Sequence, residues 1–301
     1  MKKPNLITVL GSTATGKTLL ASNLASKIDG EIISADSRQV YRGMDIGTGK
    51  DLEDYKIPYH LINIVDAGAS YNVFEYQKDF LTAYNDITNR KKIPVLCGGT
   101  GMYIEAVLKG YKLIKVPVNE NLRQELELKT NDELEAIFKK FKTPHNVSDL
   151  NSKKRLLRAI EIEYHYTKNS EIDTFYPEIN TLIFGIKYER EIVKKRITQR
   201  LKNRLDHGMI DEVNILLKKG IPSDQLIYYG LEYKFVTNYL LGNLTYDEMF
   251  TKLNIAIHQF SKRQMTWFRR MERNGFQINW IDGNLSINEK IDTALKTIDS
   301  L

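Results

Sequence analysis

The chain has 301 residues, a length that suits one large α/β domain or a domain with an insertion and excludes a peptide or a single minimal domain. Hydrophobic residues make up 42% and charged residues 27%, so the chain has enough apolar mass to bury a core. The net charge of +6 mildly favours an anionic partner such as nucleic acid, although many enzymes share such a charge.

Short apolar runs alternate with helical patterns through the first hundred residues. Residues 6–10 predict a buried strand that runs into glycine and is followed by a helix over about 16–28. Further strands are predicted over 31–34, 61–65 and 93–97, with a helix over 72–89 between the last two. This alternation predicts an α/β fold with a doubly wound parallel sheet flanked by helices.

The strand signals disappear after about residue 118. Three polar-faced helices are predicted there, over 119–129, 132–141 and 152–166. A strand over 181–186, long basic helices over 189–219 and 246–273, and a closing strand over 276–281 then return to the first pattern. We therefore expect a core formed by residues 1–117 and 181–301 and an α-helical insertion domain over 118–180.

One loop carries the strongest local signal. It matches G-x-x-x-x-G-K-[ST] between a predicted strand and a predicted helix, as in the P-loop NTPase fold, and reads Gly11, Ser12, Thr13, Ala14, Thr15, Gly16, Lys17 and Thr18. Glycines let backbone amides point at a phosphate group, and the helix N-terminus adds its dipole. Lys17 supplies a point charge and Thr18 can coordinate magnesium, so this loop is expected to bind a diphosphate or polyphosphate.

The acid that an ordinary P-loop kinase needs for magnesium is missing from the strand over 93–97, which ends in Gly98 and Gly99. Asp36 instead ends a core strand, and the carboxyl ends of neighbouring parallel strands line the ligand crevice, so Asp36 is expected near the phosphate loop together with Thr100. Asp36 could bind magnesium through water, accept a proton from a nucleophile, or cap the next helix.

Several longer stretches extend this pattern beyond the phosphate loop. They are Gly11–Thr18, Ile32–Lys50, Pro58–Ile62, Gly98–Tyr103, Lys153–Glu161 and Lys262–Arg269. Together they resemble the tRNA dimethylallyltransferases, also called tRNA isopentenyltransferases, over nearly the whole chain. No cysteine and histidine finger follows Leu301, which favours the bacterial type.

The resemblance implies transfer of a dimethylallyl group from dimethylallyl diphosphate to the exocyclic amine of adenosine 37 in tRNA, just 3′ of the anticodon, with release of diphosphate. It implies that Asp36 is the general base on that amine and that Thr100 contacts the leaving diphosphate. Lys17 and Arg200 complete the expected catalytic set, because both would stabilise the developing diphosphate anion. Mg²⁺ at Thr18 is the expected cofactor.

The acceptor base must leave its loop stack to enter a P-loop crevice, so a flipped base is expected. By the resemblance, the tRNA anticodon stem-loop would contact the insertion and a set of residues that belong to the matching motifs or carry positive charge. The set is Asp36, Ser37, Arg38, Gln39, Thr100, Arg123, Lys154, Arg155, Leu156, Leu157, Arg158, Lys262, Arg263 and Gln264. The segment Gly230–Tyr233 departs from the family's pattern, as does the region over 118–150.

Three alternatives remain open at this stage. An adenylate isopentenyltransferase would use free AMP, ADP or ATP as the acceptor, but would not need the helical insertion or the basic C-terminal helices. A P-loop small-molecule kinase would need the missing acid. A tRNA-binding module without chemistry would not need Lys17, Thr18, Asp36 and Thr100 together.

The remaining features concern location and assembly. Cys97 is the single cysteine, so the chain has no internal disulfide and no Cys/His zinc finger, which fits a reducing, cytoplasmic location. No apolar stretch approaches the roughly 18 residues of a membrane span. We expect a monomer with no protein partner and no membrane contact.

Overall fold

The computed structural model describes residues 3–141, 152–168 and 176–300. The chain forms two compact units, one made of Met1–Tyr111 with Glu178–Leu301 and one made of Lys112–Pro177. We call them the core unit and the inserted unit. The inserted unit thus begins at residue 112 and ends at residue 177, where the sequence indicated 118 and 180.

A parallel sheet forms the centre of the core unit. Its strand order is β4-β2-β6-β1-β7-β8, and every neighbouring pair is parallel. The bounds are β1 Leu6–Gly11, β2 Gly30–Ala35, β4 Tyr59–His60, β6 Ile93–Gly98, β7 Thr181–Lys187 and β8 Ile278–Asp282. β1 and β2 are buried along their whole length, as expected for strands covered on both faces.

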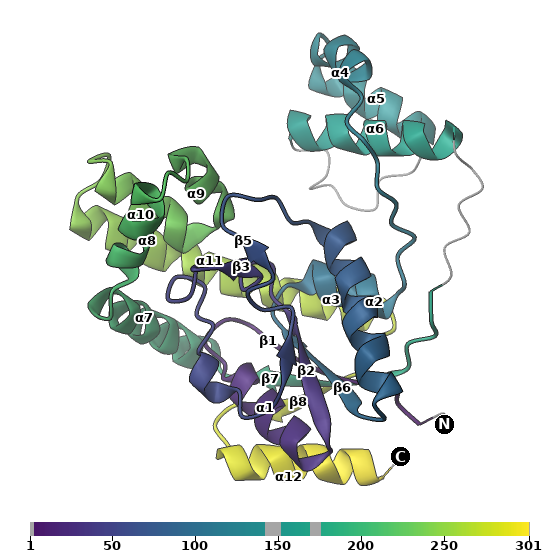
Figure 1. Ribbon diagram of the computed structural model, residues 1–301, viewed down its shortest axis with the longest axis vertical. Coiled ribbons are helices and arrows are strands. Elements are labelled where there is room, and N and C mark those ends of the chain that lie inside the picture. The colour runs from purple at the N-terminus through teal and green to yellow at the C-terminus, as the bar shows by residue number, and fades with distance from the viewer. Residues whose placement is uncertain (1–2, 142–151, 169–175, 301) are drawn as a thin grey trace. The chain divides into compact units, whose positions relative to one another are not determined.

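Alternating side chains of the strands form two hydrophobic clusters, one on each face of the sheet. Leu6 and Leu10 of β1 pack with side chains of α2 (Val73–Asn89), α3 (Gly101–Leu108) and α11 (Tyr246–Arg273). Ile7 and Val9 pack on the opposite face with α1 (Lys17–Lys27) and α12 (Ile287–Asp299). Figure 1 shows α2 and α3 on one side of the strands and α12 on the other.

A third cluster joins the C-terminal helices to the segment after β2. It contains side chains of α7 (Arg190–Asp206), α8 (Met209–Lys218), α9 (Ser223–Tyr229), α10 (Leu231–Leu240) and α11, packed around Val40, Tyr41 and Met44. Two short strands, β3 (Tyr41–Arg42) and β5 (Val65–Asp66), pair beside it, and η1 (Leu52–Asp54) is one 3₁₀ turn. This packing fixes the segment that carries the second matching motif.

The inserted unit has its own small core. α4 (Glu120–Glu127), α5 (Asn131–Phe141) and α6 (Lys153–Lys168) each have an apolar stripe, and the stripes meet in one cluster. Its buried members are Leu126, Leu134, Phe138, Leu156, Leu157 and Ile160. The three helices predicted for this region are confirmed.

The strands predicted over 6–10, 31–34, 93–97, 181–186 and 276–281 are confirmed, but the strand over 61–65 is wrong. Leu61 and Asn63 have φ of 63° and 57°, which no strand tolerates, so the chain pairs with β2 only at Tyr59–His60 and with β3 only at Val65–Asp66.

The single helix predicted over 189–219 is also wrong. Gly208 adopts a φ of 95° and separates α7 from α8, since this left-handed backbone ends one helix and begins the next. The helices α3, α9, α10 and α12 were not predicted from the sequence. None of the described helices is both long and apolar enough to cross a membrane.

Candidate active site at the phosphate loop

The phosphate loop connects the end of β1 to the first turn of α1. Gly16 precedes α1 with a φ of 80°, a left-handed conformation that glycine adopts without strain. No side chain caps this helix end, so the first amides of α1 are available to an anion. Within the loop, the hydroxyl of Thr15 donates to the carbonyl of Ser12 at 2.8 Å, and both side chains are buried. The loop is therefore held in shape before any ligand arrives.

Two long-range contacts hold the loop from outside. Gln264 of α11 accepts a hydrogen bond from the amide of Thr13 at 2.8 Å and donates to the carbonyl of Gly99 at 2.9 Å. A Cβ at Gly99 would lie 2.5 Å from Gln264 Nε2, so the close approach requires glycine. Arg196 of α7 donates from Nε to the carbonyl of Ala14 at 2.7 Å.

Gln264 is thus placed differently from the expectation that it binds tRNA. Its side chain is buried between the phosphate loop and the end of β6, where both its amide groups are already bonded. We correct this expectation: Gln264 supports the phosphate loop.

Asp36 and Thr100 connect the carboxyl ends of β2 and β6, which are neighbours in the sheet. Asp36 Oδ1 accepts hydrogen bonds from the amides of Arg38 at 2.9 Å and Gln39 at 3.4 Å. The hydroxyl of Thr100 accepts from the amide of Ser37 at 3.1 Å. Asp36 Oδ2 has no hydrogen-bond partner among the described residues, so one oxygen fixes the turn and the other can accept a proton.

Lys17 is a cation without a partner at this site. No carboxylate of the described residues lies within ion-pair distance of its ammonium group. Burial lowers the pKa of Lys17, and the nearby Asp36 and Asp51 carboxylates oppose this effect without contacting it. Burial also raises the pKa of the adjacent Cys97 thiol to about 12, which keeps the thiol neutral. An anion on the loop would therefore find Lys17 unengaged.

Three arginines spaced four residues apart lie along one face of α7. Arg196 reaches Ala14, and Arg200 forms an ion pair with Asp51 and donates to the carbonyl of Gly49 at 3.4 Å. Arg204 is mostly buried, with its guanidinium 3.6 Å from Glu232 and one Nη left without a partner among the described residues. Burial lowers the pKa of Arg204 to about 10.

The sequence indicated Arg204 only as one member of a dense run of positive charge, although its spacing from Arg200 is the signal that could have placed it on the same helix face. Arg200 was expected at the diphosphate, and it shares the electrostatic environment of Lys17.

The segment over 36–50 is held by buried polar contacts that the motif alone does not explain. Glu212 of α8 accepts from the amides of Asp45 and Ile46, both at 2.7 Å, and from the Tyr233 hydroxyl at 2.7 Å. Lys50 is buried and donates to the carbonyl of Tyr41 at 2.6 Å and to the side chain of Asp45 at 2.5 Å. Glu212 is a structural residue of this site that sequence reasoning missed.

The expected tRNA-binding residues of the core unit differ in exposure. Lys262 and Arg263 directly precede Gln264 on α11 and are exposed, whereas Gln264 is buried. Arg38 is half-buried and lies 5.9 Å from the centre of the Tyr228 ring. Gln39 is buried, donating to the carbonyl of Gly49 at 3.1 Å and accepting from Ser34 at 3.2 Å. Gln39 therefore holds the backbone of this segment. The expectation that it contacts tRNA is corrected, because its side chain is buried.

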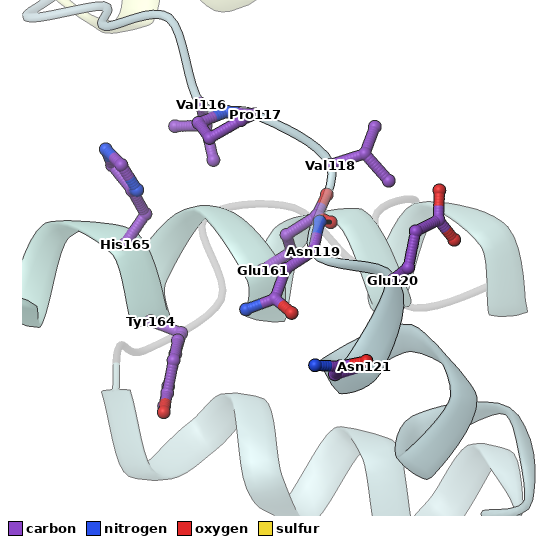
Figure 2. A pocket seen from close by; sticks show the side chains of 9 residues that line it. All are labelled: Val116, Pro117, Val118, Asn119, Glu120, Asn121, Glu161, Tyr164 and His165. Carbon is purple, nitrogen blue, oxygen red and sulfur yellow. Dashed lines mark hydrogen bonds between the residues drawn. The ribbon is translucent and has the colours of Figure 1, made fainter.

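In the inserted unit, Glu161 is buried and gathers polar groups around it. It accepts from the amide of Asn119 at 2.6 Å and forms ion pairs with Arg123 at 3.0 Å and with Arg158. Figure 2 shows Glu161 and Asn119 at a pocket of about 320 Å³ in this unit. Arg123, which was expected at tRNA, thus connects α4 to α6. Arg158, also expected at tRNA, lies on α6 with Glu161 and donates to the carbonyl of Val116 at 2.7 Å.

Four further expected residues begin α6, and only two of them face solvent. Leu156 and Leu157 are buried in the core of the inserted unit, which corrects their assignment to tRNA. Lys154 and Arg155 are exposed, so they are the members of this run that a nucleic acid could contact.

Comparison with known proteins adds independent findings. A family model described as IPP transferase matches residues 39–271. A protein named tRNA dimethylallyltransferase 2 from Bacteroides fragilis is 58% identical over 293 residues, covering 96% of both chains. A protein named tRNA dimethylallyltransferase 1 from Parabacteroides distasonis is 55% identical over 305 residues, covering 100% of this chain and 99% of that one.

Solved structures agree with this. The full-length tRNA isopentenylpyrophosphate transferase of Bacillus halodurans matches with a TM-score of 0.73 and 33% identity, over 100% of this chain and 96% of that chain. A eukaryotic dimethylallyltransferase, solved while acting on tRNA, matches with a TM-score of 0.80 over 99% of this chain and 80% of its own. Its identity of 22% supports the shared fold alone.

Proposed function

The chain belongs to the IPP transferase family, and we propose that it transfers a dimethylallyl group from dimethylallyl diphosphate to the exocyclic amine of tRNA adenosine 37. One structural observation supports the proposed reaction. Among the described residues, Lys17 of the phosphate loop has no ion-pair partner, and the loop adjoins strand ends at which one carboxylate oxygen of Asp36 accepts no hydrogen bond. A site for a leaving anion thus lies beside a site for a proton.

The phosphate loop would act on the leaving group. In the transfer, the bond between the allylic carbon and the diphosphate oxygen breaks while the adenine nitrogen bonds to that carbon. Negative charge develops on the diphosphate, where the first amides of α1, Lys17 and Arg200 can stabilise it. Because Gln264 and Arg196 already hold the loop, little reorganisation is needed when that charge appears.

Asp36 would act on the nucleophile. An aromatic amine is a weak nucleophile, so removal of its proton as the new bond forms favours the reaction. The proton would pass to Asp36 Oδ2, while Oδ1 stays bonded to the amides of Arg38 and Gln39. Thr100 holds the adjoining strand end through Ser37, and its hydroxyl would contact the leaving diphosphate.

Mg²⁺ is compatible with the donors at the loop. The Thr18 hydroxyl is a hard oxygen ligand, and Asp36 supplies a carboxylate close to Lys17. The described residues contain no group of three His, Cys, Asp or Glu side chains that could hold a metal by themselves, so the ion would depend on diphosphate oxygens. When bound, it would neutralise part of the leaving group's charge.

The acceptor requires a basic surface around the site. We propose that Ser37, Arg38, Lys262 and Arg263 contact tRNA from the core unit, and that Lys154 and Arg155 do so from the inserted unit. All the named cations are at least partly exposed, as phosphate contacts require. The proposed reaction would take place in the cytoplasm, where tRNA is modified.

The alternatives are less well supported. A kinase needs an acid at the end of β6, where this chain has Gly98, Gly99 and Thr100. An adenylate-specific enzyme has no need of a separately folded inserted unit. The relatives at 55–58% identity are named for tRNA, which favours the proposed acceptor.

The deciding experiment is an endpoint assay with purified protein, magnesium and radiolabelled dimethylallyl diphosphate. Unmodified total tRNA and a mixture of AMP and ATP are offered as acceptors in separate reactions. Label in tRNA alone is the expected result. Label in the mononucleotides would move the acceptor to free adenylate, and label in neither would contradict the proposal.

A further inference from the structure

A second pocket lies on the other side of the phosphate loop from Asp36 and Thr100. The sheet places β2 and β6 on one side of β1 and β7 and β8 on the other. Asp36 and Thr100 follow the first pair, whereas this pocket of about 430 Å³ lies against the segments that follow the second. The phosphate loop itself contributes Thr15 and Gly16 to its lining.

Two cations meet in this pocket over one aromatic ring. The guanidinium of Arg196 lies 4.9 Å from the centre of the Tyr188 ring, and the ammonium of Lys290 lies 5.7 Å from it. Lys290 is only 9% exposed, yet the described residues give its ammonium neither an ion pair nor a hydrogen bond. Arg196 uses Nε for the carbonyl of Ala14 and leaves both Nη groups without a partner among the described residues.

This arrangement is unfavourable in the absence of an anion. Lys290 stands in the first turn of α12, where the helix dipole is positive and disfavours a cation. Burial lowers the pKa of Lys290, and the positive charge of Arg196 lowers it further.

The nearby acids do not offset this cost by contact. Glu289 accepts from the amide of Ser286 in the cap of α12, and Asp282 accepts from Asn284. Arg196 is itself exposed, so the unmet need for an acceptor is that of the buried Lys290 ammonium. An anion between the two cations would reduce the repulsion between them and supply that acceptor.

We propose that Lys290 and Arg196 form a second anion subsite that takes one phosphate group beside the phosphate loop. The group could be free inorganic phosphate or the outer phosphate of a polyphosphate chain whose other phosphates occupy the loop. The dimethylallyl group is not the occupant, because in the proposed reaction it must face Asp36 on the opposite side. Only the second of these occupants, a polyphosphate chain, depends on the proposed diphosphate site in the loop.

The test is calorimetric titration of the full chain with inorganic phosphate, diphosphate and tripolyphosphate at constant ionic strength. Lys290→Met keeps the length and apolar contacts of the side chain and removes its charge, and Lys296→Met is the matched control on the exposed face of the same helix. We expect Lys290→Met to weaken phosphate and tripolyphosphate binding about tenfold, to leave diphosphate binding unchanged, and Lys290→Arg to restore binding.

The three titrants distinguish the two possible occupants of the subsite. They also distinguish failure of the subsite from failure of the proposed function. Phosphate that binds alongside diphosphate identifies free phosphate as the occupant, whereas tripolyphosphate that excludes diphosphate and binds more tightly identifies a bridging chain. Equal affinities of the wild type and Lys290→Met for all three ions would overturn the subsite. Failure of the wild type to bind diphosphate would instead count against the proposed function, and the subsite would then be judged on inorganic phosphate alone.

Discussion

The surroundings of the phosphate loop in the core unit and the interior of the inserted unit use polar side chains in different ways. In the core unit, side chains from distant elements bond to backbone: Gln264 to Thr13 and Gly99, and Glu212 to residues 45–47. In the inserted unit, one buried acid, Glu161, gathers two arginines and an amide. The first pattern fixes backbone around the candidate site, and the second joins α4 to α6. The difference shows where the molecule requires an exact backbone and where it requires only a stable surface.

Removing the proton acceptor should give the largest effect and should be confined to the core unit. We expect Asp36→Asn to reduce turnover on tRNA by about 10²- to 10⁴-fold, the usual contribution of a positioned general base. The amide oxygen can still accept from the Arg38 amide, so the fold and diphosphate binding should stay close to wild type. Single-turnover kinetics together with diphosphate titration would check this, and unchanged turnover would remove Asp36 from the mechanism.

Removing the buried acid of the inserted unit should destabilise that unit and leave the core unit folded. We expect Glu161→Ala to destabilise that unit by about 3 kcal/mol, because Arg123, Arg158 and the Asn119 amide lose their common acceptor. Hydrogen exchange should accelerate in α4 and α6 while the sheet keeps its protection. Glu125→Ala, on the exposed face of α4, is the control. Equal acceleration in both units would show that they do not unfold separately.

Lowering the pH should destabilise the core unit through one of its buried carboxylates, Glu31. Hydrogen bonds from Arg90 lower the pKa of Glu31 to about 2. A lowered folded-state pKa gives stability that is fully present above the unfolded value of 4.5 and is lost as the pH falls toward 2. A difference of one pKa unit corresponds to about 1.4 kcal/mol, so the full shift would correspond to about 3.5 kcal/mol. Because Arg90 is 41% exposed and solvent screens its charge, we expect a smaller loss, on the order of 2 kcal/mol, across that window.

The measurement is urea unfolding of the sheet at several pH values, in wild type and in Glu31→Gln. The variant should start less stable at neutral pH and show a flatter dependence between pH 4.5 and 2. Parallel pH profiles of the two proteins would assign the acid sensitivity to other groups. Glu161 in the inserted unit also has a lowered pKa, because hydrogen bonds from the Asn119 amide and the arginines outweigh its burial.

The smallest expected effect concerns the surface of the inserted unit. Replacing Lys154 and Arg155 with alanine should weaken tRNA binding several-fold and reduce the salt dependence of log affinity by about 1.4. Turnover at saturating tRNA should not change, because neither side chain belongs to the phosphate loop. Alanine at Lys139 and Lys140, two exposed cations of α5, is the matched control. The same change in both pairs would indicate a general charge effect rather than a specific contact.

The candidate site could be predicted where its residues are close in sequence. The glycines, Lys17 and Thr18 lie in one loop, and Asp36 directly follows an apolar strand, so local pattern was sufficient for them. Arg204, Glu212 and the role of Gln264 depend on contacts across more than 150 residues. Leu156 and Leu157 were assigned to tRNA from motif position, while helical periodicity places them in a core.

The sequence by itself determined the phosphate loop, the parallel sheet and the helical insertion, because each depends on short-range periodicity and on residues with special backbone preferences. Only the tertiary structure decided the helix break at Gly208, the absence of the strand predicted over 61–65, and the approach of the two cations Lys290 and Arg196 to the Tyr188 ring. The approach of Lys290 to Arg196 takes its energy from the packing of α12 and α7 around Tyr188, where Arg196 itself stays exposed. No local pattern encodes that energy, since it belongs to pairs of residues that the fold alone brings together.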